Sequence, residues 1–584
     1  MAFDVVASSR QEKEKFVPPW RRTLVTGLTF GGIALYFAMV GILTMFHERW
    51  VIYEYLSLGH ALLGLIAGGA GLYLAYKTKA SGYRDLLLQG AGAGAIAGSV
   101  AAVLAIIISQ FKLRFVFVQL KPQLLKMLTF NQDVGLGIVL LVLGAALLGA
   151  LGVVFYVMNP KIRRPLVAGL GAVGLAGLFQ ELIQLMLQTP GRVQTVREAL
   201  FTWDGLTLQG AVIIFVVTTL VMSAWQWRSD QIKAGFGRLP QAQQKSIRLS
   251  GIAFGLLLLL LFPLAAGNFI GQVLMMVGLF TLMGMGLNIE IGLAGLLDLG
   301  FVAFYAVGAY TTALLTADSP HALAHLSYWV AMPIAVLLSI VVGVLFGVPV
   351  LRVRGDYLAV ATLGLGEIVR VIVLSDAAAP LLAGAQGVLN IPRPNAAGYE
   401  LGDPVSLFYL TLVCALVAAY IAWALENSRL GRAWTAIRDD EDVAQALGIN
   451  LVNVKLLAYG LGAAFAGLAG SIFAVMLSSI YPHSFQLIIS INILALIIVG
   501  GMGSLPGVAL GALALIGLPE LLREFGEYRF LFYGLVIVIM MRIGPEGLVP
   551  SAARRREMRV DAEERAAIAA ELGAETPPTS DTQK

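Results

Sequence analysis

Long, uninterrupted apolar runs are the feature that most limits what this chain can fold into. The first covers residues 24–46. A helix rises about 1.5 Å per residue, so a run of this length crosses the roughly 30 Å hydrocarbon core of a bilayer. Because lipid offers no hydrogen-bond partner to backbone amides, runs of about twenty apolar residues must form helices. The sequence therefore predicts an all-α, polytopic membrane protein.

The composition supports the same class. Of the 584 residues, 58% are hydrophobic and 13% are charged, and the mean hydropathy is +0.83. Soluble domains average about 25% charged residues because most of their surface meets water. Lipid therefore replaces water over much of the surface of this chain. The net charge of +5 does not indicate a nucleic-acid partner, because the basic residues gather in short gaps between apolar runs.

The apolar runs fall into two groups. Six form a front section, at residues 24–46, 56–76, 86–109, 134–158, 166–187 and 209–227. Later runs lie at residues 250–266, 269–289, 296–316, 328–350, 357–374, 407–425, 456–479 and 487–499, followed by a glycine-interrupted stretch at 508–518 and 530–541. The total is about sixteen spans, within a range of about 14 to 18 membrane-spanning helices.

These runs predict five segments along the chain. They are a cytoplasmic N-terminal segment at 1–23, a membrane section of about six helices at 24–227, a polar cytoplasmic linker at 228–249, a membrane core at 250–550, and a polar, disordered cytoplasmic tail at 551–584. The first apolar run lacks a convincing cleavage site and is expected to be retained.

Charge predicts the orientation. With a cytoplasmic N-terminus, the loops that fall inside carry most of the basic residues, as the positive-inside rule requires. They are Lys77, Lys79 and Arg84; Lys161, Arg163 and Arg164; Arg228, Lys233, Arg238, Lys245 and Arg248; Arg352 and Arg354; and Arg429, Arg432 and Arg438. Both termini are then cytoplasmic. One outside loop, with Lys112, Arg114, Lys121 and Lys126, breaks the pattern: it is either an interfacial amphipathic helix or the sign of a miscounted span.

The most informative loop is residues 427–450, which is too polar to cross the membrane. Asp439 is an expected N-cap and Gly448 an expected stop for a short helix. Val443, Ala444 and Leu447 are expected to share one face of that helix. A short capped helix with a small apolar face can seat in a groove on a soluble partner. A solvated linker helix fits the pattern equally well.

Four segments carry a resemblance to a known family. They are GLNIEIGLAGLLDLGFVAFYAVGAY from Gly286, VLRVRGDYLAVATLGLGEIVRVI from Val350, RLGRAWTAIRDDEDVAQALGI from Arg429, and VGGMGSLPG from Val499. In this order, the region from about 271 to 550 resembles the LivM-type permease of branched-chain amino-acid ABC importers, and the loop at 427–450 resembles the loop that couples such permeases to their ATPases.

The resemblance implies a permease subunit in the inner membrane. The expected partners are two ABC ATPase subunits, a second homologous permease, a periplasmic binding protein and membrane lipid. ATP and magnesium would reside on the ATPases, while this chain would bind no cofactor or metal and would not be an enzyme. In agreement, the sequence contains no phosphate loop and no Gly-Lys pair. The expected coupling residues are Arg432, Ala433, Ala436, Asp439, Asp440, Glu441, Asp442, Ala444, Leu447 and Gly448.

Charged residues and broken backbone near apolar runs indicate where solute could pass. A charge at bilayer depth is costly and tends to be functional, and irregular backbone survives there only against protein or water. The translocation-path candidates are Glu290, Asp298, Tyr305, Tyr310, Asp356, Glu367, Arg370, Gly501 and Gly503. The plainer alternatives are a structural Glu367–Arg370 ion pair and ordinary helix-packing glycines.

Two further functions remain open at this point. An ion-gradient-driven secondary transporter or channel for small polar solutes would use Glu367, Asp298 or Glu290. A membrane enzyme is disfavoured because the five histidines show no ligand-like spacing. The cargo is also open, from branched-chain or related amino acids to urea or short amides. One reason is that residues 383–388 read AGAQGV where the family usually carries a T-G-G-x-x-G-I stretch.

Overall fold

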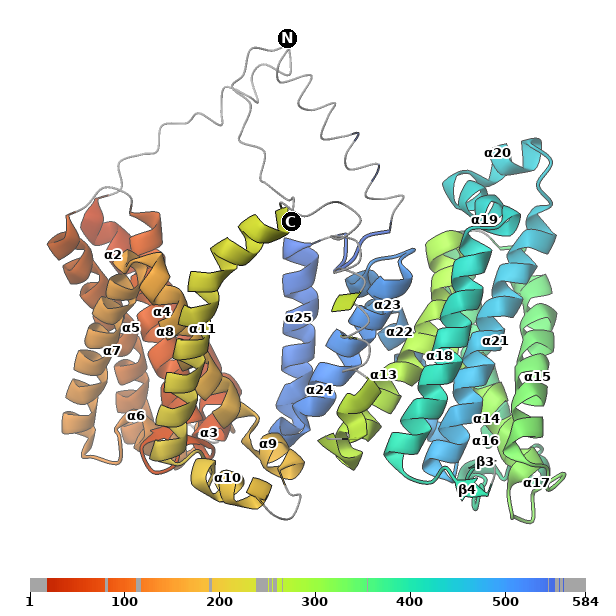
Figure 1. Cartoon of the computed structure of the whole chain (residues 1–584), viewed down its shortest axis with the longest axis horizontal. Coiled ribbons are helices and arrows are strands. Elements are labelled where there is room, and N and C mark those ends of the chain that lie inside the picture. Colours follow the sequence, from red (N-terminus) through yellow and green to blue (C-terminus); the bar gives the residue numbers. More distant parts are fainter. Residues whose placement is uncertain are drawn as a thin grey trace, which may run out of the picture. The chain divides into compact units, whose positions relative to one another are not determined.

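The chain divides into two compact units, residues 1–254 and 255–584 (Figure 1). The computed structural model describes residues 18–78, 82–111, 117–187, 192–237, 250–251, 255, 260–264, 266–353, 355–396, 398–544, 546–551, 556 and 560. Most of the predicted N-terminal segment and polar tail, and residues 238–249 of the predicted linker, lie outside these ranges. The first ten residues of that predicted linker are helical, because α11 (Leu208–Gly237) continues through them.

The first unit is built of helices and one small hairpin. Its strands are β1 (Trp50–Ile52) and β2 (Leu56–Ser57), which pair antiparallel. Besides α11, its helices are α2 (Pro19–Val40), α3 (Ile42–His47), α4 (Leu58–Lys77), α5 (Tyr83–Gln110), α6 (Pro122–Leu128), α7 (Val134–Val157), α8 (Pro160–Leu178), α9 (Gln180–Met186) and α10 (Arg192–Leu200).

Glycines bring three helices of this unit into backbone contact. A Cβ atom built on Gly149 of α7 would overlap the carbonyl oxygen of Gly90 on α5. One built on Gly71 of α4 would in turn overlap the carbonyl oxygen of Gly149. Lipid tails are as apolar as leucine, so helices in a bilayer gain stability from such close packing rather than from the hydrophobic effect. The α4–α5–α7 crossing is therefore specified by these small residues.

The predicted span at 166–187 is wrong as a single helix, because α8 and α9 meet at a 77° bend. Polar side chains of α9 explain the bend. Gln180 Nε2 donates to the carbonyl of Asp204 at 3.2 Å, and Gln184 Nε2 donates to that of Thr202 at 3.0 Å. These bonds hold α9 against the turn before α11, where apolar runs alone predict a straight helix.

The loop that broke the charge pattern contains α6. Its apolar residues Leu124, Met127 and Leu128 are buried, whereas Lys126 is exposed. A short amphipathic helix is one of the two explanations that the sequence left open, and it is the one the described part of this loop supports. Lys112 and Arg114 lie outside the described residues.

The second unit holds the described helices from α13 onwards and a second hairpin. The hairpin pairs β3 (Asn395–Ala396) with β4 (Tyr399–Glu400). The helices are α13 (Asn268–Leu287), η3 (Asn288–Leu293), α14 (Val302–Thr316), α15 (Tyr328–Val350), α16 (Asp356–Leu374), α17 (Ala379–Leu382), η4 (Gly384–Gln386), α18 (Pro404–Glu426), α19 (Arg429–Asp439), α20 (Glu441–Ala446), α21 (Leu451–Leu477), η5 (Pro482–Ser484), α22 (Leu487–Gly500), α23 (Leu505–Ala512), η6 (Leu513–Gly517), α24 (Leu518–Leu521), η7 (Arg523–Tyr528) and α25 (Arg529–Ile543).

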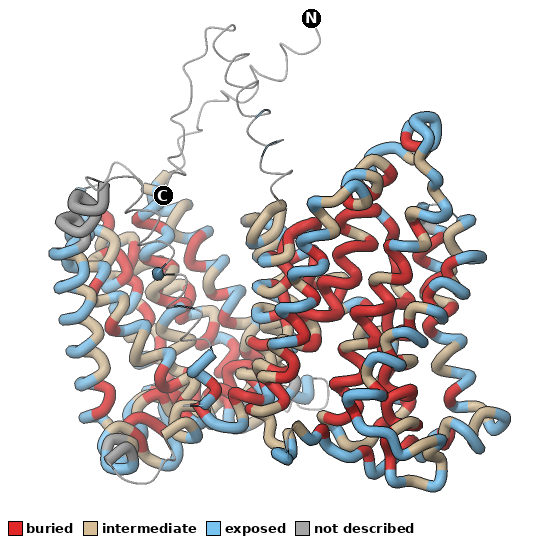
Figure 2. Tube along the Cα trace, turned by 45° about the vertical axis from the view of Figure 1, so that its right-hand side comes forward, coloured by how far each residue is buried: buried red, intermediate tan, exposed pale blue. Residues whose placement is uncertain are grey.

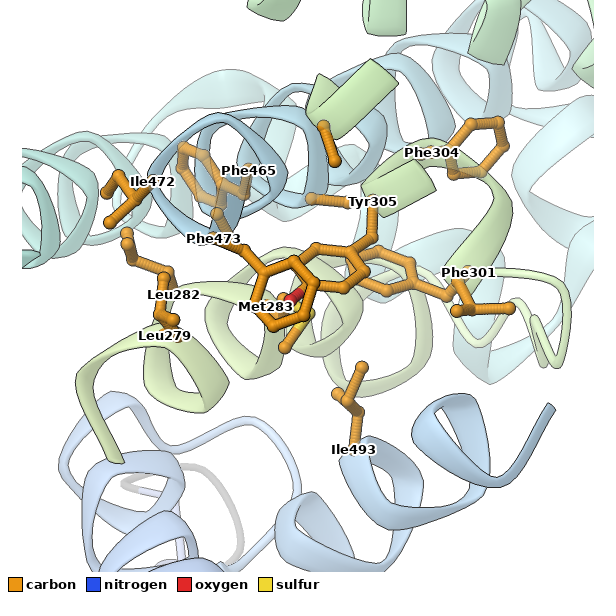
Figure 3. Close-up of a cluster of buried hydrophobic side chains, with 14 of the residues drawn as sticks. Leu279, Leu282, Met283, Phe301, Phe304, Tyr305, Phe465, Ile472, Phe473 and Ile493 are labelled. Atoms are coloured by element: carbon orange, nitrogen blue, oxygen red, sulfur yellow. The ribbon is translucent and has the colours of Figure 1, made fainter. Parts of the chain in front are cut away.

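Two helices form the centre of this unit. In their most apolar stretches, 72% of the residues are buried in α13 with η3 and 78% in α21, compared with 28% in α15. Figure 2 shows buried residues along the inside of the helices and exposed residues along their outer faces. Figure 3 shows the large side chains of α13, α14, α21 and α22 meeting in one cluster. A helix that is apolar all round is expected at such a central position.

The predicted fold class is confirmed. Among the described residues, eleven helices are long and apolar enough to cross a membrane, or twelve if α8 and α9 count as one span. The sequence count of about 14 to 18 also includes segments that are shorter helices here. They are α14 and α25, with 15 residues each, and the chain of short helices at Leu505–Leu521. The run at 250–266 is described only in part.

The glycine contacts predict that Gly149→Ala destabilises the first unit. The added methyl group meets backbone atoms that cannot move aside, and such overpacking costs about 1–3 kcal/mol. Gly144→Ala, on the same helix, is the matched control because a Cβ there meets nothing within 4 Å. Thermal unfolding of the two variants in detergent measures the difference. Equal transition temperatures would contradict the packing.

Candidate functional site

The loop at 427–450 forms two helices, α19 and α20, at one end of the second unit (Figure 1). The Ser428 side chain caps α19 by accepting hydrogen bonds from the amides of Leu430 and Gly431. Trp434 is fully buried, and its Nε1 donates to the carbonyl of Val454 at 2.9 Å. This contact fixes α19 against the start of α21. The first helix of the loop is therefore packed against the core.

The cap of the second helix differs from the predicted one. Asp440, not Asp439, is the N-cap of α20, and its Oδ1 accepts from the amides of Asp442 at 2.9 Å and Val443 at 3.0 Å. Asp439 is instead the last residue of α19, because the extended backbone of Asp440 ends that helix. The predicted stop is confirmed: Gly448 follows the helix with a φ of +88°, which favours glycine.

The expected apolar face of α20 is divided between the interior and the surface. Ala444 is 1% exposed, so it packs inside the chain and is no contact for a partner. Val443 and Leu447 are 54% and 76% exposed. Of the other predicted coupling residues, the exposed ones are Arg432, Asp439, Asp440, Asp442 and Gly448, and the half-buried ones are Ala433, Ala436 and Glu441. The apolar surface offered by α20 is thus the pair Val443 and Leu447.

Two contacts missed by the sequence reasoning tie this loop to the core. Arg438 Nη1 donates to the carbonyl of Gly292 at 2.8 Å, which joins α19 to η3. Lys455 of α21 forms a 2.5 Å ion pair with Glu441 of α20, and the lysine side chain is only 6% exposed. A lysine at the edge of an apolar run was the available signal, since a buried charge requires a partner.

The backbone between η3 and α14 is irregular, and side chains from other helices satisfy it. The amide of Leu299 donates to Thr362 Oγ1 on α16 at 3.0 Å. The amide of Val302 donates to Ser490 Oγ on α22 at 3.0 Å. Asp298 Oδ1 accepts from the amide of Gly300 at 2.7 Å. These bonds pair the amides of Leu299, Gly300 and Val302 where the chain leaves the helix.

The second glycine-rich break packs against the first. Gly501 and Gly503 have φ values of +114° and +74°, and the amide of Gly503 donates to Asn288 Oδ1 of η3 at 2.8 Å. On its other side, the amide of Val549 donates to the carbonyl of Gly500 at 2.9 Å. Both glycines therefore form a turn that links η3 to the chain after α25.

The other path candidates differ in how far they are buried. Glu290 and Asp298 are 0% and 1% exposed. Tyr305 lies in the buried cluster of Figure 3, with its ring 5.2 Å from that of Phe473. Tyr310 and Arg370 line a cavity of about 10 Å³, which has room for about one water molecule. The side chain of Asp356 lies outside the described residues.

Glu367 and Arg370 form the ion pair that their spacing suggested. Arg370 Nε donates to both carboxylate oxygens of Glu367, at 2.9 and 3.0 Å. Their side chains are 47% and 32% exposed on a helix of membrane-spanning length. Because an ion pair facing hydrocarbon is costly, this face of α16 requires water or another protein beside it.

A multi-pass helical core with a packed polar loop at one end defines an integral-membrane protein. Residues 269–541 match the family described as "Branched-chain amino acid transport system / permease component". The high-affinity branched-chain amino acid transport system permease protein LivM of Escherichia coli is 34% identical over 401 residues, which cover 64% of this chain and 92% of the relative. The chain belongs to the LivM-type family of branched-chain amino acid permeases and is a multi-pass protein of the bacterial inner membrane.

Two more distant relatives also match part of this chain. The probable LivM permease protein of Methanocaldococcus jannaschii is 23% identical and covers 48% of this chain and 94% of the relative. The LivH permease protein of Escherichia coli is 27% identical over 30% of this chain and 56% of the relative. No solved structure matches the chain. Since residues 255–584 make up less than 64% of the chain, the match to the Escherichia coli LivM protein extends into the first unit.

The buried ion pair predicts that Glu441→Gln loosens α20. Without the carboxylate, the Lys455 ammonium stays buried without its counter-charge, at a cost of about 1–2 kcal/mol. Thermal unfolding and limited proteolysis within 440–450 measure the effect. Asp439→Asn is the control, because that side chain is 71% exposed and a surface pair contributes little. The prediction is wrong if both variants behave alike.

Proposed function

We propose that this chain is the membrane-spanning permease subunit of a binding-protein-dependent ABC importer for branched-chain or related amino acids. Separate ATPase subunits bind ATP and magnesium and supply the energy. The observation that carries the proposal is the packed α19–α20 loop, which presents Val443 and Leu447 to solvent at one end of a family permease core. The cargo class follows the printed names of the relatives, which are branched-chain amino acid permeases.

The α19–α20 loop has the properties needed to receive force from an ATPase. Its exposed apolar pair, Val443 and Leu447, fits an apolar groove on a soluble partner. The loop is held rigidly by the Asp440 cap, by the buried Trp434 and by the ion pair between Glu441 and Lys455. Movement of the docked helix therefore reaches α21 through Lys455 and η3 through Arg438, instead of being lost in a flexible loop.

A second, homologous permease would cover α16. The charged Glu367–Arg370 pair is exposed on this span, where lipid is a poor neighbour and a water-lined path between two permeases is a good one. The partial match to a LivH permease protein supports common ancestry of two such subunits. With α19 and α20 on the cytoplasmic side, the hairpin β3–β4 and α17 lie at the opposite, periplasmic end of the unit (Figure 1), where a binding protein would deliver the cargo.

Reconstitution tests the proposal directly. The chain is placed in liposomes with its second permease, the two ATPases and the binding protein, and uptake of radiolabelled leucine is followed. We expect uptake to require ATP and both ATPases and to persist when an uncoupler collapses the proton gradient. Uptake without the ATPases, or its loss on adding uncoupler to ATP-loaded vesicles, would favour an ion-gradient-driven carrier instead. Competition by urea or short amides in the same assay tests the alternative cargoes.

The exposed pair on α20 predicts the outcome of a charge substitution. Leu447→Asp or Val443→Asp should place a charge in the apolar contact, so that uptake falls about tenfold or more while the chain still inserts. The matched control is Gln445→Asp on the same helix, because Gln445 is exposed and lies off the line joining Val443 and Leu447. The assay compares uptake with ATP hydrolysis. Full uptake in both Asp variants of the pair would exclude α20 as the docking helix.

The link from α19 to η3 predicts a different effect for Arg438→Ala. This substitution removes the guanidinium bond to the Gly292 carbonyl, a charge-assisted bond whose loss costs about 1.5–3 kcal/mol. ATPase docking should survive because Arg438 is not part of the Val443–Leu447 surface, whereas uptake per ATP hydrolysed should fall about tenfold. Co-purification of the ATPases and the ratio of uptake to hydrolysis separate the two effects. An unchanged ratio would show that this bond transmits nothing.

A further inference from the structure

Two carboxyl groups lie buried together at the joint between η3 and the irregular segment that follows it. Glu290 belongs to η3 and is 0% exposed, and Asp298 belongs to the segment 294–301 and is 1% exposed. The two carboxyls interact with each other, and the hydroxyl of Tyr459 on α21 lies beside Asp298. Neither the loop contacts nor the ion pair on α16 uses this cluster.

Several polar atoms of the cluster lack a hydrogen-bond partner among the described residues. They are both carboxyl oxygens of Glu290, Oδ2 of Asp298 and the hydroxyl of Tyr459. Buried polar atoms are rarely left unpaired, because the lost hydrogen bonds to water must be replaced. Two ionised carboxylates have no hydrogen to share, so they cannot satisfy each other. A single proton placed between them would pair one oxygen of each carboxyl.

The charged groups around the cluster do not neutralise it. The helices packed against η3 are α13, α21 and α19, and the turn at Gly503 also contacts it. Neither α13 nor residues 500–507 carry an ionisable side chain. On α19, Arg438 binds the carbonyl of Gly292 and the side chain of Asp439. On α21, Lys455 binds Glu441. The uncharged hydroxyls of Thr362 and Ser490 bond the amides of Leu299 and Val302. On α16, the charged side chains of Glu367 and Arg370 pair with each other.

The packing around Glu290 favours a proton over a metal ion. A Cβ atom added to Gly462 would overlap Oε1 of Glu290, so α21 presses directly on this carboxyl. A hydrated or fully coordinated cation needs six or more oxygen ligands and the space to arrange them. No group of three or more acidic, histidine or cysteine side chains suited to a metal occurs among the described residues.

We propose that Glu290 and Asp298 together bind one proton, as a carboxylic acid that donates to the neighbouring carboxylate. Like charges in contact in a water-excluded site cannot both persist, which is the physical reason for the shared proton. The proton is taken from solvent and no other bond changes. Asp298 keeps its bond to the amide of Gly300 through Oδ1, so the capping oxygen and the proton-sharing oxygen are different atoms.

The shared proton gives the contact between η3 and segment 294–301 two states, one protonated and one not. With the proton in place, the acid–carboxylate bond holds η3 against segment 294–301. Loss of the proton leaves two adjacent negative charges that repel each other. Because Arg438 binds the carbonyl of Gly292 two residues after Glu290, this repulsion acts on the element that α19 holds.

Infrared spectroscopy of the purified full chain in detergent tests the proposal without any partner or cargo. A protonated carboxyl has a C=O stretching band separate from that of carboxylates. We expect wild-type protein at neutral pH to show this band, and Glu290→Gln to lose it. Glu367→Gln, which removes an exposed, ion-paired carboxylate, is the matched control and should leave the band unchanged. No protonated-carboxyl band in wild type, or an unchanged band in Glu290→Gln, would overturn the proposal.

A second variant covers the case in which Glu290→Gln does not fold. Asp298→Asn keeps a carbonyl oxygen to accept from the amide of Gly300 but replaces the carboxylate that accepts the shared proton with an uncharged amide, so the band of Glu290 should remain and shift in frequency. If neither variant folds, the pH dependence of the band in wild-type protein gives the answer, because carboxyls in water lose their proton well below neutral pH while the proton shared in a buried pair stays. Loss of the band before neutral pH is reached would refute the buried carboxyl pair.

Discussion

The structure depends on one constraint, which is that every backbone amide at membrane depth needs a partner inside the protein. Segment 294–301 leaves the helix, yet Thr362 accepts from the amide of Leu299, Ser490 from that of Val302 just after it, and Asp298 caps its own turn. The Asn288 side chain does the same for Gly503 in the second break. These helix interruptions are therefore specified by particular side chains on α16, α22 and η3, and they are stable features of the fold.

The same interruption creates the contact point for the cytoplasmic loop. In a continuous α-helix, the carbonyl of Gly292 would accept from the amide of residue 296. Here the amide of Leu296 donates instead to the carbonyl of Glu290, and Arg438 binds the carbonyl of Gly292. The π-helical geometry of η3 thus supplies an acceptor that a regular helix would have used internally, and α19 is attached to the core through it.

The sequence predicts the features that depend on local pattern. It misses the features that depend on contacts between residues far apart in the chain. Apolar runs identify the spans, and Gly448 marks the end of α20 because its positive φ is a local requirement. The bend between α8 and α9 is missed, since it rests on bonds from Gln180 and Gln184 to residues about twenty positions away. The burial of Ala444 is missed for the same reason: spacing shows which residues share a face, but not which part of that face meets the core.

The two units achieve close packing by different means, and this difference locates the part of the molecule that can change state. In the first unit, α4, α5 and α7 touch backbone to backbone at Gly71, Gly90 and Gly149, an arrangement with little freedom to shift. In the second unit, η3 and the segment after it are held by hydrogen bonds from α19, α16 and the turn at Gly503, each of which can break singly. Hydrogen bonds of this kind can be exchanged one at a time, whereas helices in backbone contact can only separate as a whole. Conformational change is therefore expected around η3, with the first unit serving as a rigid membrane-embedded body.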